Sequence, residues 1–184
     1  MEAMPGSAEE ISNHSFEATD ELLLGANVWF FLYGPHRPGS PQAAAYSGAL
    51  TRILAANSRI YVDVLIISEF VNRYARLKHQ LLHGRHGVPR DFKRFRGTAA
   101  FKTIARDIAA DTRKILSNCT RVDSGFATLD VDALVNSYGT GNSDFNDLVL
   151  VELCRRKGFM LVTGDGDFKG KGITVLTANR RLLI

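Results

Sequence analysis

Short apolar runs and longer helix-like runs follow one another along most of the chain. Runs with the length and composition of buried strands are found at 21–24, 59–62, 121–123, 159–162 and 173–176. Segments with the apolar spacing of helices are found at 27–33, 42–56, 64–82, 98–118, 131–137 and after Asp144. Strands that alternate with helices and lack hairpin turns predict an α/β fold. We expect a three-layer α/β/α arrangement with a central parallel β-sheet.

The chain is expected to form one domain behind a short extension. Its 184 residues, 45% of them hydrophobic, can bury a core without a metal or a disulfide. Residues 1–20 are polar and acidic without periodicity, which predicts a flexible N-terminal extension to a single domain at 21–184. Cys119 and Cys154 lack metal-ligand spacing, and the chain has neither a secretory signal nor an 18-residue apolar span. These features predict a cytoplasmic protein without membrane contact.

Charge is distributed unevenly along the chain. Six of the 19 acidic residues lie within 1–24, where there is no lysine or arginine, so the rest of the chain is strongly basic. An enlarged helical middle at about 73–121 contains 13 lysines and arginines but only three aspartates, with aromatic residues among them. Such a surface attracts phosphate backbones and stacks on unpaired bases, although a solvated helical face is the alternative. The residues expected to contact RNA are Arg85, Arg90, Lys93, Arg94 and Arg96.

Acidic residues near the C-terminus form the main candidate site. Asp144 and Asp147 stand three residues apart at the start of a helical run, which places both on one face. Asp165 follows an apolar strand, and ligands in parallel sheets gather at the carboxyl ends of strands. Asp63 also follows a strand, but its position favours a helix N-cap. Converging carboxylates repel one another unless a hard cation neutralises them, which predicts Mg²⁺ or Mn²⁺ and phosphodiester chemistry.

The same motifs resemble PIN domains, especially the ribonuclease toxins of VapBC toxin-antitoxin pairs. The matching segments occur in the family's order from about Leu22 to the C-terminus. They are Leu-Leu-Leu-Gly-Ala-Asn-Val-Trp at 22–29, Ile-Ser-Glu-Phe-Val at 67–71, Asp-Leu-Val-Leu at 147–150, Lys-Gly at 157–158 and Leu-Val-Thr-Gly-Asp-Gly-Asp-Phe at 161–168.

The resemblance implies a PIN-like fold and a metal-dependent endoribonuclease that cleaves single-stranded or structured RNA, with transfer RNA and ribosomal RNA as candidates. It also implies homodimerisation and an antitoxin that covers the acidic groove. The residues implied to be catalytic and to bind metal are Glu69, Asp144, Asp147 and Asp165, with Asp167 as a further metal ligand. Asn27, Ser68 and Thr163 are expected to orient carboxylates or metal-bound water.

One position departs from the family pattern. The family's opening strand ends in an aspartate, then a small or hydroxyl residue and an asparagine, whereas this chain has Gly25, Ala26 and Asn27. Glycine supplies no side-chain oxygen, so weaker metal binding and impaired catalysis are expected. Two origins stay open: a naturally degenerate nuclease, or an aspartate-to-glycine change that allows a toxic enzyme to be expressed. The intact neighbouring residues favour the second.

Gly25 also supports an alternative function, a non-catalytic PIN-type RNA-binding or scaffold domain. A weaker alternative is a Toprim-like nucleic-acid enzyme that uses Glu69, Asp165 and Asp167, but it leaves Asp144 and Asp147 unexplained. The chain contains no Gly-x-Ser-x-Gly elbow, no P-loop lysine motif and no zinc-like Cys/His spacing. Serine-hydrolase, P-loop and structural zinc chemistry are therefore not expected.

Overall fold

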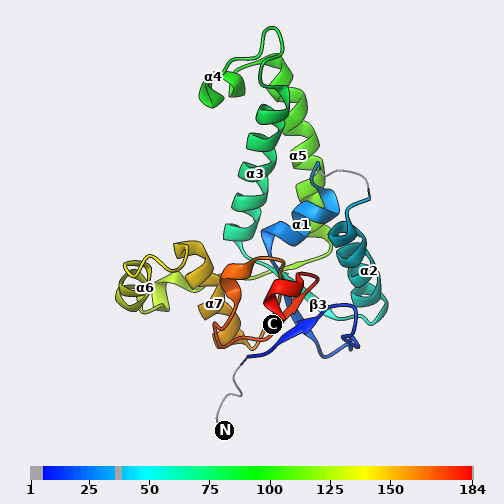
Figure 1. The fold of residues 1–184 in the computed structure, drawn as a ribbon, viewed down its shortest axis with the longest axis vertical. Coiled ribbons are helices and arrows are strands. Elements are labelled where there is room, and N and C mark those ends of the chain that lie inside the picture. The colour runs from blue at the N-terminus through cyan, green and yellow to red at the C-terminus, as the bar shows by residue number, and fades with distance from the viewer. Residues whose placement is uncertain (1–5, 36–38, 184) are drawn as a thin grey trace.

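The computed structural model describes residues 6–35 and 39–183, whose strands form one parallel sheet between helical layers (Figure 1). The strands pair in the order β1-β6-β5-β2-β3-β4. Their bounds are β1 Ala8–Glu10, β2 Glu21–Leu24, β3 Arg59–Val62, β4 Thr120–Arg121, β5 Met160–Val162 and β6 Val175–Thr177. The predicted three-layer α/β/α fold is confirmed, and the apolar residues of β2 are buried near the centre of the sheet.

Helices occupy the segments in which apolar spacing predicted them, and a further short helix lies at 92–96, where a loop was predicted. They are α1 Ala26–Tyr33, α2 Pro41–Ala55, α3 Val64–Leu82, α4 Phe92–Arg96, α5 Ala99–Ser117, α6 Val131–Tyr138 and α7 Phe145–Lys157. The described residues also form 3₁₀ turns, which are η1 Phe126–Thr128, η2 Gly166–Phe168 and η3 Arg180–Leu182. Asp63 caps α3, because its Oδ1 accepts a hydrogen bond from the Leu65 amide at 2.8 Å. The cap expected from the sequence is confirmed.

The first part of the chain differs from the sequence prediction. Residues 6–20 are not a flexible extension, since β1 pairs with β6 at the edge of the sheet and Ile11 is fully buried. The Arg52 guanidinium donates to the carbonyls of Ile11, Ser12 and His14 at 2.6, 3.2 and 2.9 Å. A three-residue strand is too short to show periodicity, and its partner strand is far away in sequence. Residues 1–5 of the expected extension lie outside the described residues.

The basic middle of the chain forms a helical arm. Figure 1 shows α3 and α5 side by side, leading away from the sheet, with α4 at the far end. The segment predicted as a loop at 83–97 contains α4, because Asp91 caps a turn that buries Phe95 completely. His79 stacks on Phe95, with 4.8 Å between ring centroids, and its Nε2 is hydrogen-bonded to the Pro89 carbonyl at 2.8 Å. The arm therefore has an apolar interior of its own.

Candidate functional site

The ends of two paired strands form the centre of the candidate site. Leu24 in β2 lies opposite Val162 in β5, and the Gly25 amide donates to the Val162 carbonyl at 2.9 Å. This pairing places Gly25 beside the loop that leads from Thr163 to Asp165. The backbone therefore brings Gly25 and the loop to Asp165 together at the carboxyl edge of the sheet, where ligands were expected to gather.

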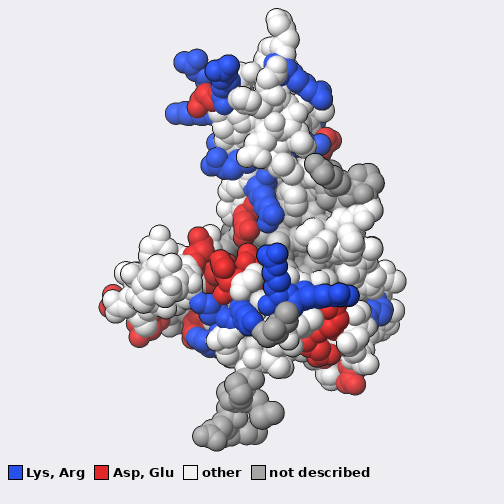
Figure 2. Space-filling view, in the orientation of Figure 1, with Lys and Arg blue, Asp and Glu red and all other residues white. Residues whose placement is uncertain are grey.

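Carboxylates reach this edge from three directions. Glu69 comes from α3, Asp144 and Asp147 come from the start of α7, and the other two belong to the turn after β5. Figure 2 shows acidic side chains gathered at the base of the arm. We call Glu69, Asp144, Asp147, Asp165 and Asp167 the carboxylate cluster.

Burial and the other four carboxylates of the cluster determine the pKa of Asp147. Burial is the largest cause that raises its pKa to about 7, and the negative charges of Asp165, Asp144, Glu69 and Asp167 add to the effect. Asp147 cannot withdraw into solvent, because it belongs to the first turn of a helix whose next four residues, 148–151, are all buried. The fold therefore holds a carboxyl group in place against electrostatic repulsion.

Glu69 lies in a similar environment. Burial is the main cause that raises its pKa, the Arg73 guanidinium acts in the opposite direction, and Asp165 and Asp144 raise it further. Asp144 and Asp165 use one carboxylate oxygen each as a local cap: Asp144 Oδ1 accepts from the Asn146 amide at 2.8 Å, and Asp165 Oδ1 accepts from the Asp167 amide at 3.1 Å. These hydrogen bonds fix the orientation of both carboxylates.

The carboxylate oxygens of the cluster are the type of ligand that a hard divalent cation prefers, but they do not form a complete metal site. Oxygen ligands that repel one another suit Mg²⁺ or Mn²⁺. Across residues 6–35 and 39–183, however, no three Asp, Glu, His or Cys side chains lie close enough together to hold a metal ion. The cluster is therefore brought to one edge of the sheet without forming a finished coordination shell.

Gly25 lies where a further ligand would fit. Its backbone angles, φ −64° and ψ 158°, are open to any residue. A Cβ at this position would lie 3.4 Å from Thr163 Oγ1 and 3.5 Å from the Val162 carbonyl oxygen, which are ordinary contacts. Gly25 is also the N-cap of α1 without a side-chain cap, a position that aspartate favours. Neither backbone strain nor lack of space requires glycine here.

Asn27 and Thr163 connect α1 to the turn that carries Asp165. Asn27 Nδ2 donates to Thr163 Oγ1 at 2.9 Å, and Asn27 Oδ1 accepts from the Gly164 amide at 3.2 Å. Thr163 Oγ1 also accepts from the Asp165 amide at 3.1 Å. Ser68 lies on α3, where its hydroxyl accepts from Asn72 Nδ2 at 3.3 Å. Asn27 and Thr163 thus hold the backbone of the site, whereas the hydrogen bond of Ser68 stays within α3.

The residues expected to contact RNA lie far from the carboxylate cluster. Arg85, Arg90, Lys93, Arg94 and Arg96 are all exposed at the far end of the arm. In the described parts of the chain, none has a carboxylate within salt-bridge distance. At 1.5 Å of rise per residue, the helix from Glu69 to Leu82 alone separates the two regions by about 20 Å. The fold therefore does not bring these cations to the acidic edge.

Two other arginines occupy the intervening space. A hollow of about 660 Å³ follows α3 away from Glu69 and includes Arg73 and Arg76. The Arg73 guanidinium lies 4.9 Å from the centre of the Phe30 ring. Both arginines belong to the basic middle of the chain, but they were not among the residues expected to contact RNA. Their spacing of four and seven residues from Glu69, which gives one helical face, was the available signal.

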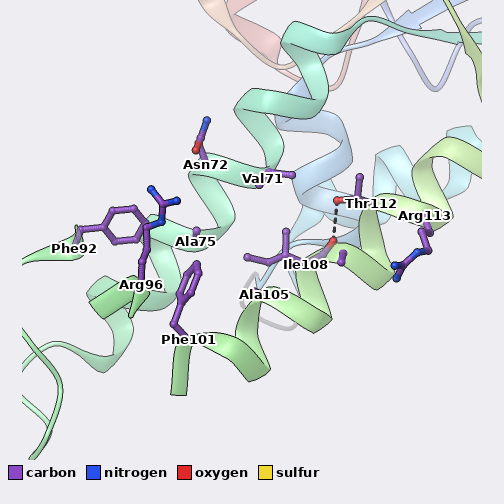
Figure 3. A pocket seen from close by; sticks show the side chains of 11 residues that line it. Val71, Asn72, Ala75, Phe92, Arg96, Phe101, Ala105, Ile108, Thr112 and Arg113 are labelled. Carbon is purple, nitrogen blue, oxygen red and sulfur yellow. Dashed lines mark hydrogen bonds between the residues drawn. The ribbon is translucent and has the colours of Figure 1, made fainter. Parts of the chain in front are cut away.

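A separate groove lies between α3 and α5. It has a volume of about 470 Å³, and Figure 3 shows Val71, Ala75, Phe101 and Ile108 lining it. Arginines also border this groove, but no carboxylate lines it. The groove therefore lacks the acidic groups of the candidate metal site.

Comparison with known proteins agrees with this fold. The model of the PIN domain family matches residues 22–174. The fold is similar to that of VapBC2 from Rickettsia felis, solved with a promoter DNA fragment, with a TM-score of 0.53 and 15% identity over 85% of this chain and 98% of that chain. It is also similar to PAE2754 from Pyrobaculum aerophilum, with a TM-score of 0.50 and 16% identity over 90% and 94% of the two chains. No curated protein sequence matches this chain.

None of the helices formed by the described residues is both long and apolar enough to cross a membrane.

Proposed function

The chain belongs to the PIN domain family, and on that premise we propose that it is a metal-dependent endoribonuclease and the toxin of a type II toxin-antitoxin pair. PIN domains are generally nucleases that depend on divalent metal ions. The observation that carries the proposal is that α3, the start of α7 and the turn after β5 bring five carboxylates to one edge of the sheet. Burial is the largest cause that raises the pKa of Asp147 to about 7, and the negative charges of the other four carboxylates raise it further. Such a group of negative charges requires a cation for full ionisation.

The cluster residues have distinct parts in this proposal. Asp147 and Glu69 would bind Mg²⁺ or Mn²⁺ through ionised carboxylates, with Asp144 and Asp165 completing the acidic side of the site and Asp167 contributing from the turn. When bound, the ion would supply a lowered pKa for water and neutralise charge on the phosphate. Asn27 and Thr163 keep Asp165 in position through the hydrogen bonds between α1 and its loop. Ser68 is proposed to orient bound water from α3.

Single-stranded or structured RNA is the proposed substrate, with transfer RNA and ribosomal RNA as the candidate classes. The far end of the basic arm supports this choice, since Arg85, Arg90, Lys93, Arg94 and Arg96 have no ion pair in the described structure and attract a phosphate backbone. We further propose an antitoxin that covers the acidic edge, a homodimer and a cytoplasmic location. The VapBC2 neighbour supports an antitoxin partner by analogy only.

Gly25→Asp is the direct test of the nuclease proposal. The substitution adds an oxygen ligand where a Cβ has room, so Mn²⁺ affinity measured by calorimetry should rise by tenfold or more, and RNA cleavage should appear or increase. Gly48→Asp is the matched control, because a Cβ there meets nothing within 4 Å and the residue lies on α2 away from the cluster. Equal metal affinity and cleavage in both variants would reject the proposal.

A second function is supported by Gly25 and by the unfinished ligand set of the described residues. In that case the chain is a PIN-type domain that binds RNA without cleaving it. RNA binding that persists in the Gly25→Asp variant, with no cleavage in Mg²⁺ or Mn²⁺, would favour this function.

A further inference from the structure

A pocket lies beside the C-terminal turn η3, close in sequence to the carboxylate cluster. Its volume is about 340 Å³, and it is lined by Phe31, Gln42, Tyr46, Gly164, Asn179 and Arg181. We call it the η3 pocket. Gly164 immediately precedes Asp165, so the pocket begins one residue from the cluster. Figure 2 shows lysine and arginine side chains over this C-terminal region, next to the acidic patch.

The pocket has a rigid floor. The Tyr46 hydroxyl accepts a hydrogen bond from the Ala178 amide at 3.2 Å, and a Cβ at Gly164 would lie only 2.9 Å from this hydroxyl oxygen. Glycine at 164 therefore permits the close approach of the tyrosine. Because Tyr46 is 1% exposed and its hydroxyl is hydrogen-bonded to the Ala178 amide, the floor is formed before any ligand arrives.

Asn179 fixes the wall that carries Arg181. Its Nδ2 donates to the Gly164 carbonyl at 2.8 Å, and its Oδ1 accepts from the Arg181 amide at 3.2 Å. The next residue, Leu182, is buried and anchors the turn. The position of Arg181 is thus tied to the backbone that leads directly into Asp165.

Three side chains in the pocket match the parts of a nucleotide. Phe31 is a partly exposed ring that stacks on Tyr46, with 5.6 Å between centroids, so it provides an aromatic surface for a base. Gln42 is exposed and brings an amide that can bind a base edge. In the described residues, the Arg181 guanidinium has no carboxylate within salt-bridge distance, which leaves it open to a phosphate.

The pocket also continues beyond one nucleotide. A hollow of about 570 Å³ shares Gln42, Asn179 and Arg181 with it and adds Arg180, with the carboxylate of Glu10 also in its wall. On the arm side of the cluster, the hollow with Arg73 and Arg76 begins at Glu69. Cationic side chains therefore line a hollow that includes Glu69 and a second hollow whose wall contains Gly164, the residue before Asp165.

We propose that the η3 pocket binds one unpaired nucleobase beside the scissile phosphate and thereby selects the RNA sequence that is cleaved. Phe31 stacks on the base, Gln42 reads its edge, and Arg181 binds the adjoining phosphate. This inference rests on the proposed nuclease function, because the cluster supplies the cleavage.

Binding to short single-stranded RNA, followed by fluorescence anisotropy in EDTA, tests the pocket. A series of oligonucleotides carries one abasic nucleotide at successive positions. With the unchanged protein, one position should lower the affinity by roughly 5- to 100-fold, the range expected for loss of one stacked base. Phe31→Leu should weaken binding of the intact RNA by a similar factor. In this variant the abasic nucleotide at that position should cause no further loss of affinity, because the substitution and the abasic nucleotide delete the same stacking contact.

Arg181→Ala is the second variant and alters only an exposed side chain. It should weaken binding and reduce the slope of log affinity against log salt concentration by about one, as expected for one lost phosphate contact. Lys157→Ala is the control, since it removes one exposed positive charge at the end of α7 distant from Asp147. The control should leave both affinity and slope unchanged.

The outcomes separate this inference from the proposed function. Unchanged affinity in Phe31→Leu and Arg181→Ala, with RNA still bound, would overturn the pocket and leave the nuclease proposal standing. Equal losses at every abasic position would also overturn it, because no single base would then be selected. Failure of the unchanged protein to bind any RNA would instead reject the proposed function.

Discussion

The Asn27 amide donates a 2.9 Å hydrogen bond to Thr163 Oγ1 across 136 positions of sequence. This contact joins the start of α1, beside Gly25, to the turn that carries Asp165. Thr163 is fully buried, so its hydroxyl has no water to replace the amide. The hydrogen bond therefore links the helix that begins beside Gly25 to the turn that carries Asp165.

Asn27→Ala should destabilise the protein by about 1–3 kcal/mol, because it removes the donor to buried Thr163 and the acceptor for the Gly164 amide. Urea unfolding measures the change. Asn72→Ala is the control, since the Asn72 amide makes only a 3.3 Å hydrogen bond to Ser68 on the exposed side of α3. The control should change stability by less than about 0.5 kcal/mol. Similar losses in both variants would contradict the linking role of Asn27.

Asp147 should make the metal-free protein less stable as pH rises from about 4 to 7. Its pKa is raised from 3.8 to about 7 in the fold, so within this interval the folded state retains a proton that the unfolded chain has lost. Asp147→Asn removes this difference. In EDTA the variant should match the parent near pH 4 and exceed it at pH 8 by about 1–2 kcal/mol, a value reduced for partial solvent contact.

Urea unfolding across this pH range tests the effect of Asp147. Asp107→Asn, which neutralises an exposed carboxyl on α5, is the control and should leave the curve unchanged. If the stability of Asp147→Asn depends on pH in the same way as that of the unchanged protein, then Asp147 is not the group whose ionisation destabilises the fold.

Charge reversal at the end of the arm should weaken RNA binding. Replacing Arg90, Arg94 and Arg96 by glutamate removes three exposed cations, so affinity should fall and the salt slope should decrease by about three or more. Mn²⁺ affinity should stay the same, because these residues lie about 20 Å or more from Glu69 along the arm. Anisotropy at several salt concentrations is the measurement. Unchanged RNA affinity with loss of a protein partner would identify the arm as an antitoxin surface instead.

Phe95→Ala should destabilise the far end of the arm by about 3–4 kcal/mol. Phe95 is fully buried, stacks on His79, and lies 5.5 Å from Phe101 between ring centroids. Phe126→Ala, at a ring that is 56% exposed, is the control and should cost less than about 1 kcal/mol. Hydrogen exchange would show whether the loss is confined to α4 and the adjoining turns of α3 and α5. Equal effects of the two substitutions would contradict a packed arm interior.

Interactions between neighbouring residues allowed several elements of this protein to be predicted from the sequence alone. The apolar runs at 21–24 and 59–62 became strands with the same bounds, and Asp63 was recognised as a cap, because strand burial and capping depend on neighbouring residues. Gly25 was also visible as a departure from the family pattern. Backbone angles and free space at this position then showed that the fold does not demand glycine.

Contacts between distant segments were decided only by the tertiary structure. The pairing of β1 with β6, the enclosure of Phe95 and the meeting of Gly164 with Tyr46 each join residues whose proximity no local pattern encodes. The raised pKa of Asp147 likewise depends on charges from α3, from the start of α7 and from the turn after β5. Electrostatic repulsion and burial act through space, so their strength follows from how the chain folds back on itself and not from the order of its residues.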